Sequence, residues 1–128
     1  MIDAELMKLL GRPGLPPEGR FFPDTYSYPR GTSDTKVLQR ALQYASTFGF
    51  TVWLRPQELH LGKGVAASGA LATRMGLSGV SVAAETIAFH TIFELVRSTR
   101  ARVHLCRISS AQGVELVRLA KAEGLPIT

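Results

Sequence analysis

The stretch "RVHLCRISSAQGVELVRLAKAEGLPIT", residues 102 to 128, decides the fold. Its first part, "RVHLCRI" at residues 102 to 108, is largely apolar and includes β-branched residues, which predicts a strand. Ser109 and Gln112 have the spacing of a capping box, so a helix is expected next, and Gly124 ends it. "LPIT" then predicts the start of another strand. A strand, a helix and a strand in this order favour a parallel sheet covered by helices.

The preceding residues continue the same alternation. A helix is predicted from a cap at Ser33 or Asp34 to about Phe48, and Gly49 stops it. "FTVWL", residues 50 to 54, then predicts a short strand. The apolar face expected for the helix comprises Leu38, Ala41, Leu42, Ala45 and Phe48.

Residues 56 to 82 have the weakest pattern. "ELHLGKGVAASG" predicts a loop and "GALATRMG" a short helix, while residues 3 to 10 predict two further helical turns. A longer helix is expected at residues 83 to 98, with Ile87, Ile92, Phe93 and Val96 buried. The predicted fold class is α/β, with a few parallel strands flanked by helices and an irregular N-terminal arm.

The composition indicates one globular domain of 128 residues, with 45% apolar and 20% charged residues. No apolar run has the length of a membrane span and the N-terminus lacks a signal pattern, so we expect a cytoplasmic location and no membrane partner. The net charge of +5 raises the question of nucleic acid. The basic residues are scattered and do not alternate with aromatic residues, so nucleic-acid binding is not favoured.

Few residues suggest chemistry by their spacing. His60, His90 and His104 fall in a loop, a helix and a strand, without the paired spacing of a metal site, although a site assembled from distant elements stays open. "GKGVAASG" lacks the full phosphate-loop pattern and predicts a flexible connection. Cys106 is expected to be a small core residue, and Ser109 and Ser110 are expected to be helix caps rather than nucleophiles. We therefore expect no cofactor.

The segment "GLPPEGRFFPDTYSYPRGTSD", residues 14 to 34, contains a carboxylate between prolines and aromatic residues. Against an apolar wall, Glu18 would have a raised pKa and a proton available for general-acid catalysis. A solvent-facing glutamate at a turn is the alternative, and spacing alone favours it. The segment resembles the endolytic murein transglycosylases, and this resemblance implies that Glu18 is their catalytic acid. The membrane helix and most of the catalytic domain of that family have no counterpart here.

Residues 34 to 128 resemble a different family. "VLQRALQYASTFGFTVWLRPQ", "SGALATRMGLSGVSVAAETIA" and residues 102 to 128 are similar, in order, to dihydroorotases. The resemblance implies a partial TIM-barrel fold from a metal-dependent amidohydrolase of pyrimidine synthesis. It also implies a metal-binding histidine at two strand ends where this chain has Arg55 and Arg107. A guanidinium group has no lone pair for a metal.

Arginine at both positions is the pattern of inactive dihydroorotase-like proteins, which assemble with aspartate carbamoyltransferase. The resemblance therefore implies a noncatalytic structural or assembly protein that binds a protein partner or itself. Murein cleavage through Glu18, residual dihydroorotase activity with zinc, and a newly acquired protein-binding role remain alternatives. The two resemblances together predict a chimera, with an arm at residues 1 to 33 and an α/β part at residues 34 to 128.

Overall fold

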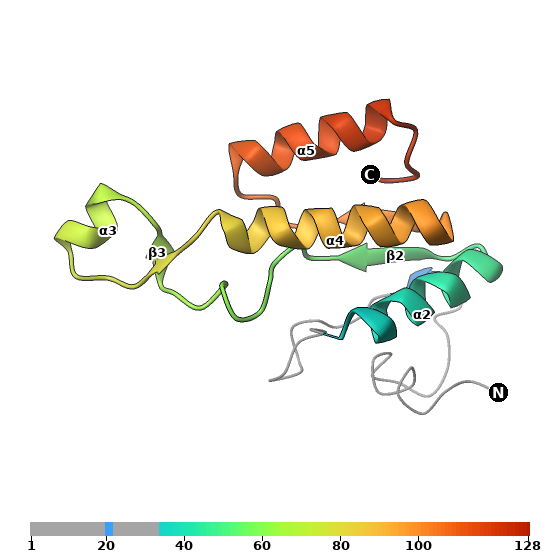
Figure 1. Cartoon of the computed structure of the whole chain (residues 1–128), viewed down its shortest axis with the longest axis horizontal. Helices are drawn as coiled ribbons and strands as arrows, with labels where there is room; N and C mark the ends of the chain where they lie inside the picture. The colour runs from blue at the N-terminus through green and yellow to red at the C-terminus, as the bar shows by residue number, and fades with distance from the viewer. Residues whose placement is uncertain (1–19, 22–33) are drawn as a thin grey trace.

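Three helices lie side by side over one face of a small parallel sheet, as Figure 1 shows. The computed structural model describes residues 20 to 21 and 34 to 128. In chain order the elements are β1 (Arg20–Phe21), α2 (Thr35–Thr47), β2 (Thr51–Leu54), β3 (Ala66–Ala67), α3 (Ala70–Arg74), β4 (Gly79–Val80), α4 (Ala83–Thr99), β5 (Arg102–Leu105) and α5 (Ala111–Ala122). The helices predicted within residues 34 to 128 and the two predicted main strands are therefore present.

The main sheet has the order β1, β2, β5, and both strand pairs are parallel. Thr51 of β2 is the partner of Arg102 of β5, and this register continues to the last residues of both strands. Beyond β5, Ile127 forms a parallel bridge with Val103. The strand expected at "LPIT" thus pairs with the sheet, and the α/β prediction with parallel strands is confirmed.

The strand predicted at residues 102 to 108 is shorter in the structure. β5 ends at Leu105, and Arg107 has a φ of 59°. This left-handed conformation cannot continue an extended strand, so the chain turns away from the sheet before α5.

The core lies between the helices and one face of the sheet. Alternate strand residues point into it, so Val52, Leu54 and Val103 are buried under the helices. α4 occupies the middle of the helical layer and contacts both α2 and α5 (Figure 1). The remaining members of the core are Leu42, Ala45, Phe89, Ile92, Phe93, Val96, Ala101, Leu105, Ala120, Leu125 and Ile127.

Two residues expected in the core are exposed. Ile87 is 46% exposed because it lies about 200° around α4 from Phe89, on the side away from the sheet. Phe48 is 55% exposed because it follows the last turn of α2 as its C-cap. Its ring contacts Tyr44 and Phe50 instead, with centroids 4.6 and 5.9 Å away.

Helix α2 begins as the sequence predicts. The Asp34 side chain accepts hydrogen bonds from the backbone N–H groups of Lys36 and Val37, at 2.9 and 3.4 Å. Asp34 is therefore the N-cap, and the alternative, Ser33, lies outside the described residues. Gly49 follows the helix with a φ of 70°, which is the left-handed conformation that commonly ends helices.

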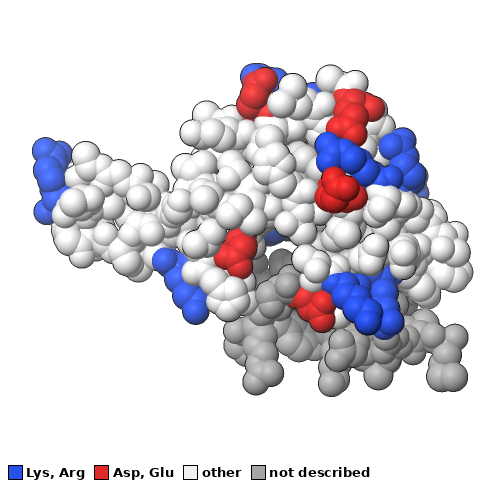
Figure 2. Space-filling model, viewed as in Figure 1, with Lys and Arg blue, Asp and Glu red and all other residues white. Residues whose placement is uncertain are grey.

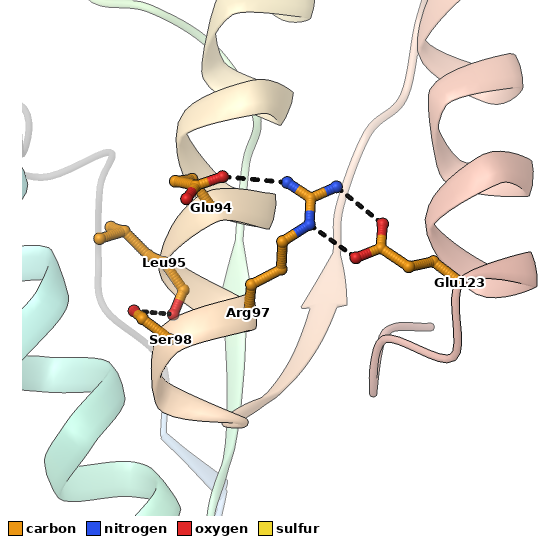
Figure 3. Close-up of polar contacts among 5 residues, drawn as sticks. All are labelled: Glu94, Leu95, Arg97, Ser98 and Glu123. Atoms are coloured by element: carbon orange, nitrogen blue, oxygen red, sulfur yellow. Dashed lines mark hydrogen bonds and ion pairs between the residues drawn. The ribbon is translucent and has the colours of Figure 1, made fainter.

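The far ends of α4 and α5 are joined by Arg97 (Figure 3). Its Nε and Nη2 donate to the two carboxylate oxygens of Glu123 at 2.6 and 2.7 Å, and its Nη1 donates to Glu94 at 3.1 Å. The hydrogen bonds between Arg97 and Glu123 raise the pKa of Arg97 and lower the pKa of Glu123. The three side chains are exposed, so the contact orients the helices more than it stabilises them.

Residues 59 to 82 form an excursion that projects away from the helices and the main sheet (Figure 1). The predicted short helix is present as α3, but the sequence did not predict that β3 and β4 form a parallel pair. The pair brings Ser68 so close that a Cβ on Gly79 would lie 2.8 Å from its Cα. The excursion is thus a small structured lobe, although "GKGVAASG" predicted a flexible connection.

Only a small part of the N-terminal arm is described. Arg20 and Phe21 of β1 pair in parallel with Thr51 and Val52. The helix predicted at residues 3 to 10 and the aromatic residues after Phe21 lie outside the described residues, and the division at residue 34 stays a prediction. None of the helices in the described part of the chain is long and apolar enough to cross a membrane.

Candidate functional site

The carboxyl ends of the main strands meet at one edge of the sheet, which is where parallel α/β proteins place their ligand sites. The chain leaves β2 at Arg55 and leaves β5 through Arg107. The first turn of α4 and the start of α5 lie at the same edge (Figure 1). We call this edge the strand-end site and define it by Arg55, Glu85, Arg107, Ser109 and Ser110.

The two arginines follow neighbouring strands. Leu54 and Leu105 are partners in the sheet, and the N–H of Cys106 donates to the carbonyl of Leu54 at 2.8 Å. Arg55 therefore follows the last pair of β2 directly, and Arg107 lies two residues beyond the last pair of β5. The structure brings the two predicted positions to one edge, with Arg55 half-buried and Arg107 exposed.

The strand-end site does not fit the metal that the resemblance implies. A guanidinium group is protonated at neutral pH and has donors only, so neither arginine is a metal ligand. Within residues 20 to 21 and 34 to 128, no group of three His, Cys, Asp or Glu side chains is placed to hold a metal ion.

The three histidines lie apart from one another. His60 is exposed at the start of the excursion and His90 is exposed on α4. His104 is half-buried on the sheet face opposite the helices, where its Nδ1 lies 2.9 Å from the Thr128 hydroxyl and its ring centroid lies 4.9 Å from that of Trp53. The structure therefore gives no support to a site assembled from all three.

Glu85 is a hydrogen-bonded polar group of the strand-end site that no pattern in the sequence predicted. Its carboxylate accepts hydrogen bonds from the N–H and hydroxyl of Ser109 at 2.7 and 2.9 Å. It also accepts from the N–H of Ser110 at 2.9 Å and from the Ser110 hydroxyl. Glu85 is only 7% exposed. It thus fixes the start of α5 to the first turn of α4.

These contacts correct the predicted cap of α5. Ser110, not Ser109, is the N-cap, and its hydroxyl accepts from the N–H of Gly113 at 2.9 Å. The capping box predicted for Ser109 and Gln112 is wrong because Ser109 lies one residue before the cap and gives both its donors to Glu85. Two consecutive serines before a helix can donate several hydrogen bonds to one acceptor, and this pair was the available signal in the sequence.

The environment of Glu85 determines its protonation state. Burial raises the pKa of the carboxyl, but the hydrogen bonds from Ser110 and Ser109 outweigh it and hold the pKa below its ordinary value. Glu85 is therefore a carboxylate at neutral pH. It has no proton to donate, so it supports the fold rather than acid catalysis.

Cys106 is the only free thiol in the described part of the chain. Burial raises its pKa, and the positive charge of Arg107 opposes that effect only in part. The thiol is therefore protonated at neutral pH, and a protonated thiol is a poor nucleophile. The prediction that Cys106 is a small core residue is not met, because the residue is half-buried and lies outside the core cluster.

The remaining sequence candidates lie elsewhere. Glu18 is outside the described residues, so nothing tests its role as a general acid. The "GKGVAASG" segment lies in the excursion, and its last glycine, Gly69, is the N-cap of α3 without any side-chain capping bond. Because α3 has only 5 residues, it offers no helix terminus of the kind that binds phosphate.

No family model matches the chain, but curated proteins do. A dihydroorotase-like protein of Pseudomonas aeruginosa is 40% identical over 99 residues, which are 77% of this chain and 23% of that protein. A dihydroorotase of Anaeromyxobacter sp. (strain K) is 40% identical over 100 residues, with the same coverage of 77% and 23%. The chain therefore spans about a quarter of the length of these relatives.

Solved structures agree on the fold. Dihydropyrimidinase from Brevibacillus agri aligns with a TM-score of 0.65 and 19% identity, over 95% of this chain and 27% of that chain. D-hydantoinase from Thermus sp. aligns with a TM-score of 0.60 and 20% identity, over 84% of this chain and 24% of that chain. The carboxyl-terminal part of the chain therefore resembles dihydroorotase-like proteins of the amidohydrolase superfamily, and its parallel β/α units resemble part of a TIM barrel.

Proposed function

We propose that the chain is a noncatalytic, dihydroorotase-like assembly protein that acts by binding another protein. The observation that carries the proposal is the presence of Arg55 and Arg107 at the ends of neighbouring strands. By the resemblance to dihydroorotases, active members bind a metal with histidines at these positions. Two guanidinium groups there remove both ligands, which leaves binding as the function of the segment.

The surface of the excursion supports a binding role. Its most exposed apolar side chains are Val65, Leu71 and Met75, at 74%, 63% and 62%. Between residues 61 and 82 the only charged residues are Lys63 and Arg74, both basic. Figure 2 shows this projecting part as mostly uncharged, with basic side chains at its tip and near the place where it joins the rest of the molecule. Exposed apolar surface with a basic rim suits a partner with an apolar patch bordered by acidic residues.

By resemblance to the inactive dihydroorotase-like proteins, the proposed partner is aspartate carbamoyltransferase. Sedimentation velocity of the chain mixed with purified aspartate carbamoyltransferase of Pseudomonas aeruginosa tests the pairing. We expect a faster boundary that contains both proteins. Leu71→Asp in the excursion should weaken the complex at least tenfold, while Leu119→Asp on the outer side of α5, where Leu119 is 60% exposed, should leave it unchanged.

The absence of catalysis is tested separately. Ring opening of dihydroorotate is measured with the chain after addition of zinc, beside an active dihydroorotase as the positive control. No turnover above background is expected. Zinc-dependent turnover that copurifies with the chain would contradict the noncatalytic role.

One sequence motif favours a second function. The segment around Glu18 resembles the endolytic murein transglycosylases, in which the matching glutamate is the catalytic acid. Incubation of purified peptidoglycan with the chain, followed by chromatography of released glycan, tests this alternative. Release that is lost in Glu18→Gln would support it, and equal release by both proteins would reject Glu18 as the acid.

A further inference from the structure

Two apolar side chains share one face of the short helix in the excursion. Leu71 and Met75 are four residues apart at α3, so they lie one turn apart on the same face. They are 63% and 62% exposed, and Val65 before β3 is 74% exposed. α3 lies at the far end of the excursion (Figure 1). Leu71 and Met75 therefore form a small apolar surface away from the core.

The two ends of α3 leave room for a second helix. A Cβ added at Gly69 or Gly76, which flank the helix, would meet nothing within 4 Å. Helices pack when side chains four residues apart on one helix enter the grooves of the other, and a position without a side chain allows the backbones to approach closely. The N–H and hydroxyl of Thr73 donate to the carbonyl of Gly69 at 3.1 and 3.2 Å. α3 is thus formed before a partner binds, which lowers the cost of ordering it.

The charge of the excursion indicates what such a helix carries. Between Glu58 and Glu85 the sequence has no other acidic residue, and Lys63 and Arg74 are its only Lys or Arg. Figure 2 shows uncharged surface between the basic side chains at the tip of the excursion and those near its base. A surface of this kind is complemented by carboxylates beside an apolar stripe.

A second copy of the chain is a poor occupant of this surface. The carboxylates on the described outer side of α4 and α5 are already in ion pairs within the chain. Glu94 and Glu123 lie 3.1 and 2.6 Å from Arg97, and Glu115 lies 3.0 Å from Arg118. Two excursions facing each other would bring basic side chains together without an acidic one. The charges therefore favour a different protein as the partner.

A membrane surface also fits less well. An anionic membrane attracts each nearby Lys or Arg by about 1 kcal/mol, and lipid-binding segments carry clusters of about four to eight such residues. The excursion has Lys63 and Arg74 only. Helices that lie in the membrane interface are commonly about 20–30 residues long, whereas α3 has 5.

We propose that α3 binds an acidic amphipathic helix of the partner protein; this inference rests on the binding role proposed above and names the element that the partner contributes. Leu71 and Met75 pack between apolar side chains of that helix. Arg74 pairs with a carboxylate beside its apolar stripe, and a guanidinium group makes two parallel hydrogen bonds to such a group. Lys63 adds attraction at the base of the excursion.

A synthetic peptide serves as the probe. It is about 18 residues long, which is five helical turns, with leucines in one stripe and glutamates on both sides of the stripe. A second peptide has lysine in place of every glutamate. The fluorescence anisotropy of each labelled peptide is measured as the whole chain is added. We expect the acidic peptide to bind, with an affinity that falls as salt is added, and the basic peptide to bind about tenfold more weakly or less.

Matched variants of the chain locate the contact. Leu71→Ala should weaken binding of the acidic peptide about tenfold, the effect of losing one buried leucine side chain, whereas Leu119→Ala on α5 should leave it unchanged. The two leucines are 63% and 60% exposed, so neither change opens the core. Arg74→Glu should weaken binding of the acidic peptide and strengthen binding of the basic peptide, which a misfolded excursion could not do. Lys121→Glu makes the same change of charge at an exposed position of α5 and should alter neither.

An acidic peptide that does not bind, or that binds Arg74→Glu as well as the unchanged chain, would overturn the proposal. So would equal binding of the two peptides. Cosedimentation with vesicles of phosphatidylcholine and phosphatidylserine, in place of peptide binding, would overturn it in favour of a membrane. A dimer that Leu71→Ala dissociates in sedimentation velocity would overturn it in favour of a second copy.

The proposed function can fail separately from this inference. If aspartate carbamoyltransferase binds the chain and the acidic peptide does not, the acidic helix is overturned and the assembly role stands. If the peptide binds with the expected effects of the variants and the carbamoyltransferase does not, the acidic helix is supported and only that enzyme is removed as the partner.

Discussion

At the residue scale, the carboxylate of Glu85 joins the starts of α4 and α5. Four donors from two consecutive serines converge on a carboxylate that is 7% exposed. Replacing the carboxylate leaves part-buried donors of Ser109 and Ser110 without their acceptor, which lowers the stability of the fold. The link between α4 and α5 therefore depends on one side chain.

Glu85→Gln should lower the free energy of unfolding at pH 7 by about 1.5–3 kcal/mol, the range for hydrogen bonds to charged groups. Urea unfolding followed by circular dichroism measures it. Glu115→Gln is the matched control, since the Glu115 side chain is 59% exposed, and it should change little. An equal loss in both variants would contradict the role of Glu85.

Low pH should remove the stabilisation that the ionised Glu85 side chain contributes to the fold. The folded pKa of Glu85 lies below its ordinary value, so the unfolded chain binds the proton first. The stabilisation is complete above the unfolded pKa of about 4.3 and is lost as the pH falls through the lower folded pKa. The stability difference between the unchanged chain and Glu85→Gln should therefore shrink below that pH. A difference that stays constant would show that the ionised form is not what the serines stabilise.

Gly113 is predicted to resist substitution despite its place inside a helix. Alanine would gain about 1 kcal/mol of helix propensity over glycine. Its Cβ would however lie 2.6 Å from Oε2 of Glu85 and 2.6 Å from Cε2 of Phe89. We expect Gly113→Ala to lose about 1–3 kcal/mol overall in urea unfolding. Gly69→Ala, where a Cβ meets nothing within 4 Å, should be close to neutral.

Cys106 should react slowly with a thiol reagent at neutral pH. Burial raises its pKa, so little thiolate is present in the folded chain. Absorbance of released thionitrobenzoate measures the rate, and the same chain in urea gives the rate of the exposed thiol. A folded chain that reacts as fast as the unfolded one would show that Arg107, and not burial, determines the pKa.

At the element scale, α4 carries more of the core than any other helix. Phe89 is 0% exposed and its ring is stacked on Phe93 with centroids 5.5 Å apart. Phe89→Ala should therefore cost about 3–5 kcal/mol in unfolding free energy. Ile87→Ala on the same helix should cost much less because Ile87 is 46% exposed. Similar losses in the two variants would mean that the outer side of α4 is covered in solution.

The elements differ in how far the sequence predicts them. The apolar period predicts α2, α4 and α5 because each buries one stripe against the sheet. The same spacing of apolar residues predicted that Ile87 and Phe48 are buried, but both are exposed. The spacing alone does not show where the buried stripe of a helix ends. β3 and β4 have two residues each and show no alternation, so their pairing arises only when the excursion folds.

The site was less predictable than the fold. Arg55 and Arg107 follow recognisable strands, so their place at one edge could be expected from the parallel order. Glu85 meets Ser109 across 24 residues of sequence, and no local spacing links them. Contacts of that kind depend on how two helix starts pack, which a single sequence does not encode in any short pattern.

At the scale of the whole molecule, we expect the main sheet to be more stable against local unfolding than the excursion. The N–H groups between β2 and β5 are buried beneath helices and should exchange slowly with deuterium even in dilute protein. The exposed excursion should exchange quickly at every concentration. Mass spectrometry of peptides after exchange measures both. Fast exchange in residues 51 to 54 would contradict a folded sheet.

The base of the excursion has a consequence for how such chains change over evolutionary time. The N–H of Glu58 donates to the carbonyl of Ala84 at 2.7 Å, so the two ends of the lobe leave and rejoin the body side by side. Each doubling of the length between such ends costs only about 0.6 kcal/mol of closure entropy. Residues 61 to 82 can therefore lengthen, shorten or be exchanged for foreign sequence while the parallel sheet keeps its register. New specificity can thus arise in the lobe without new folding problems in the body.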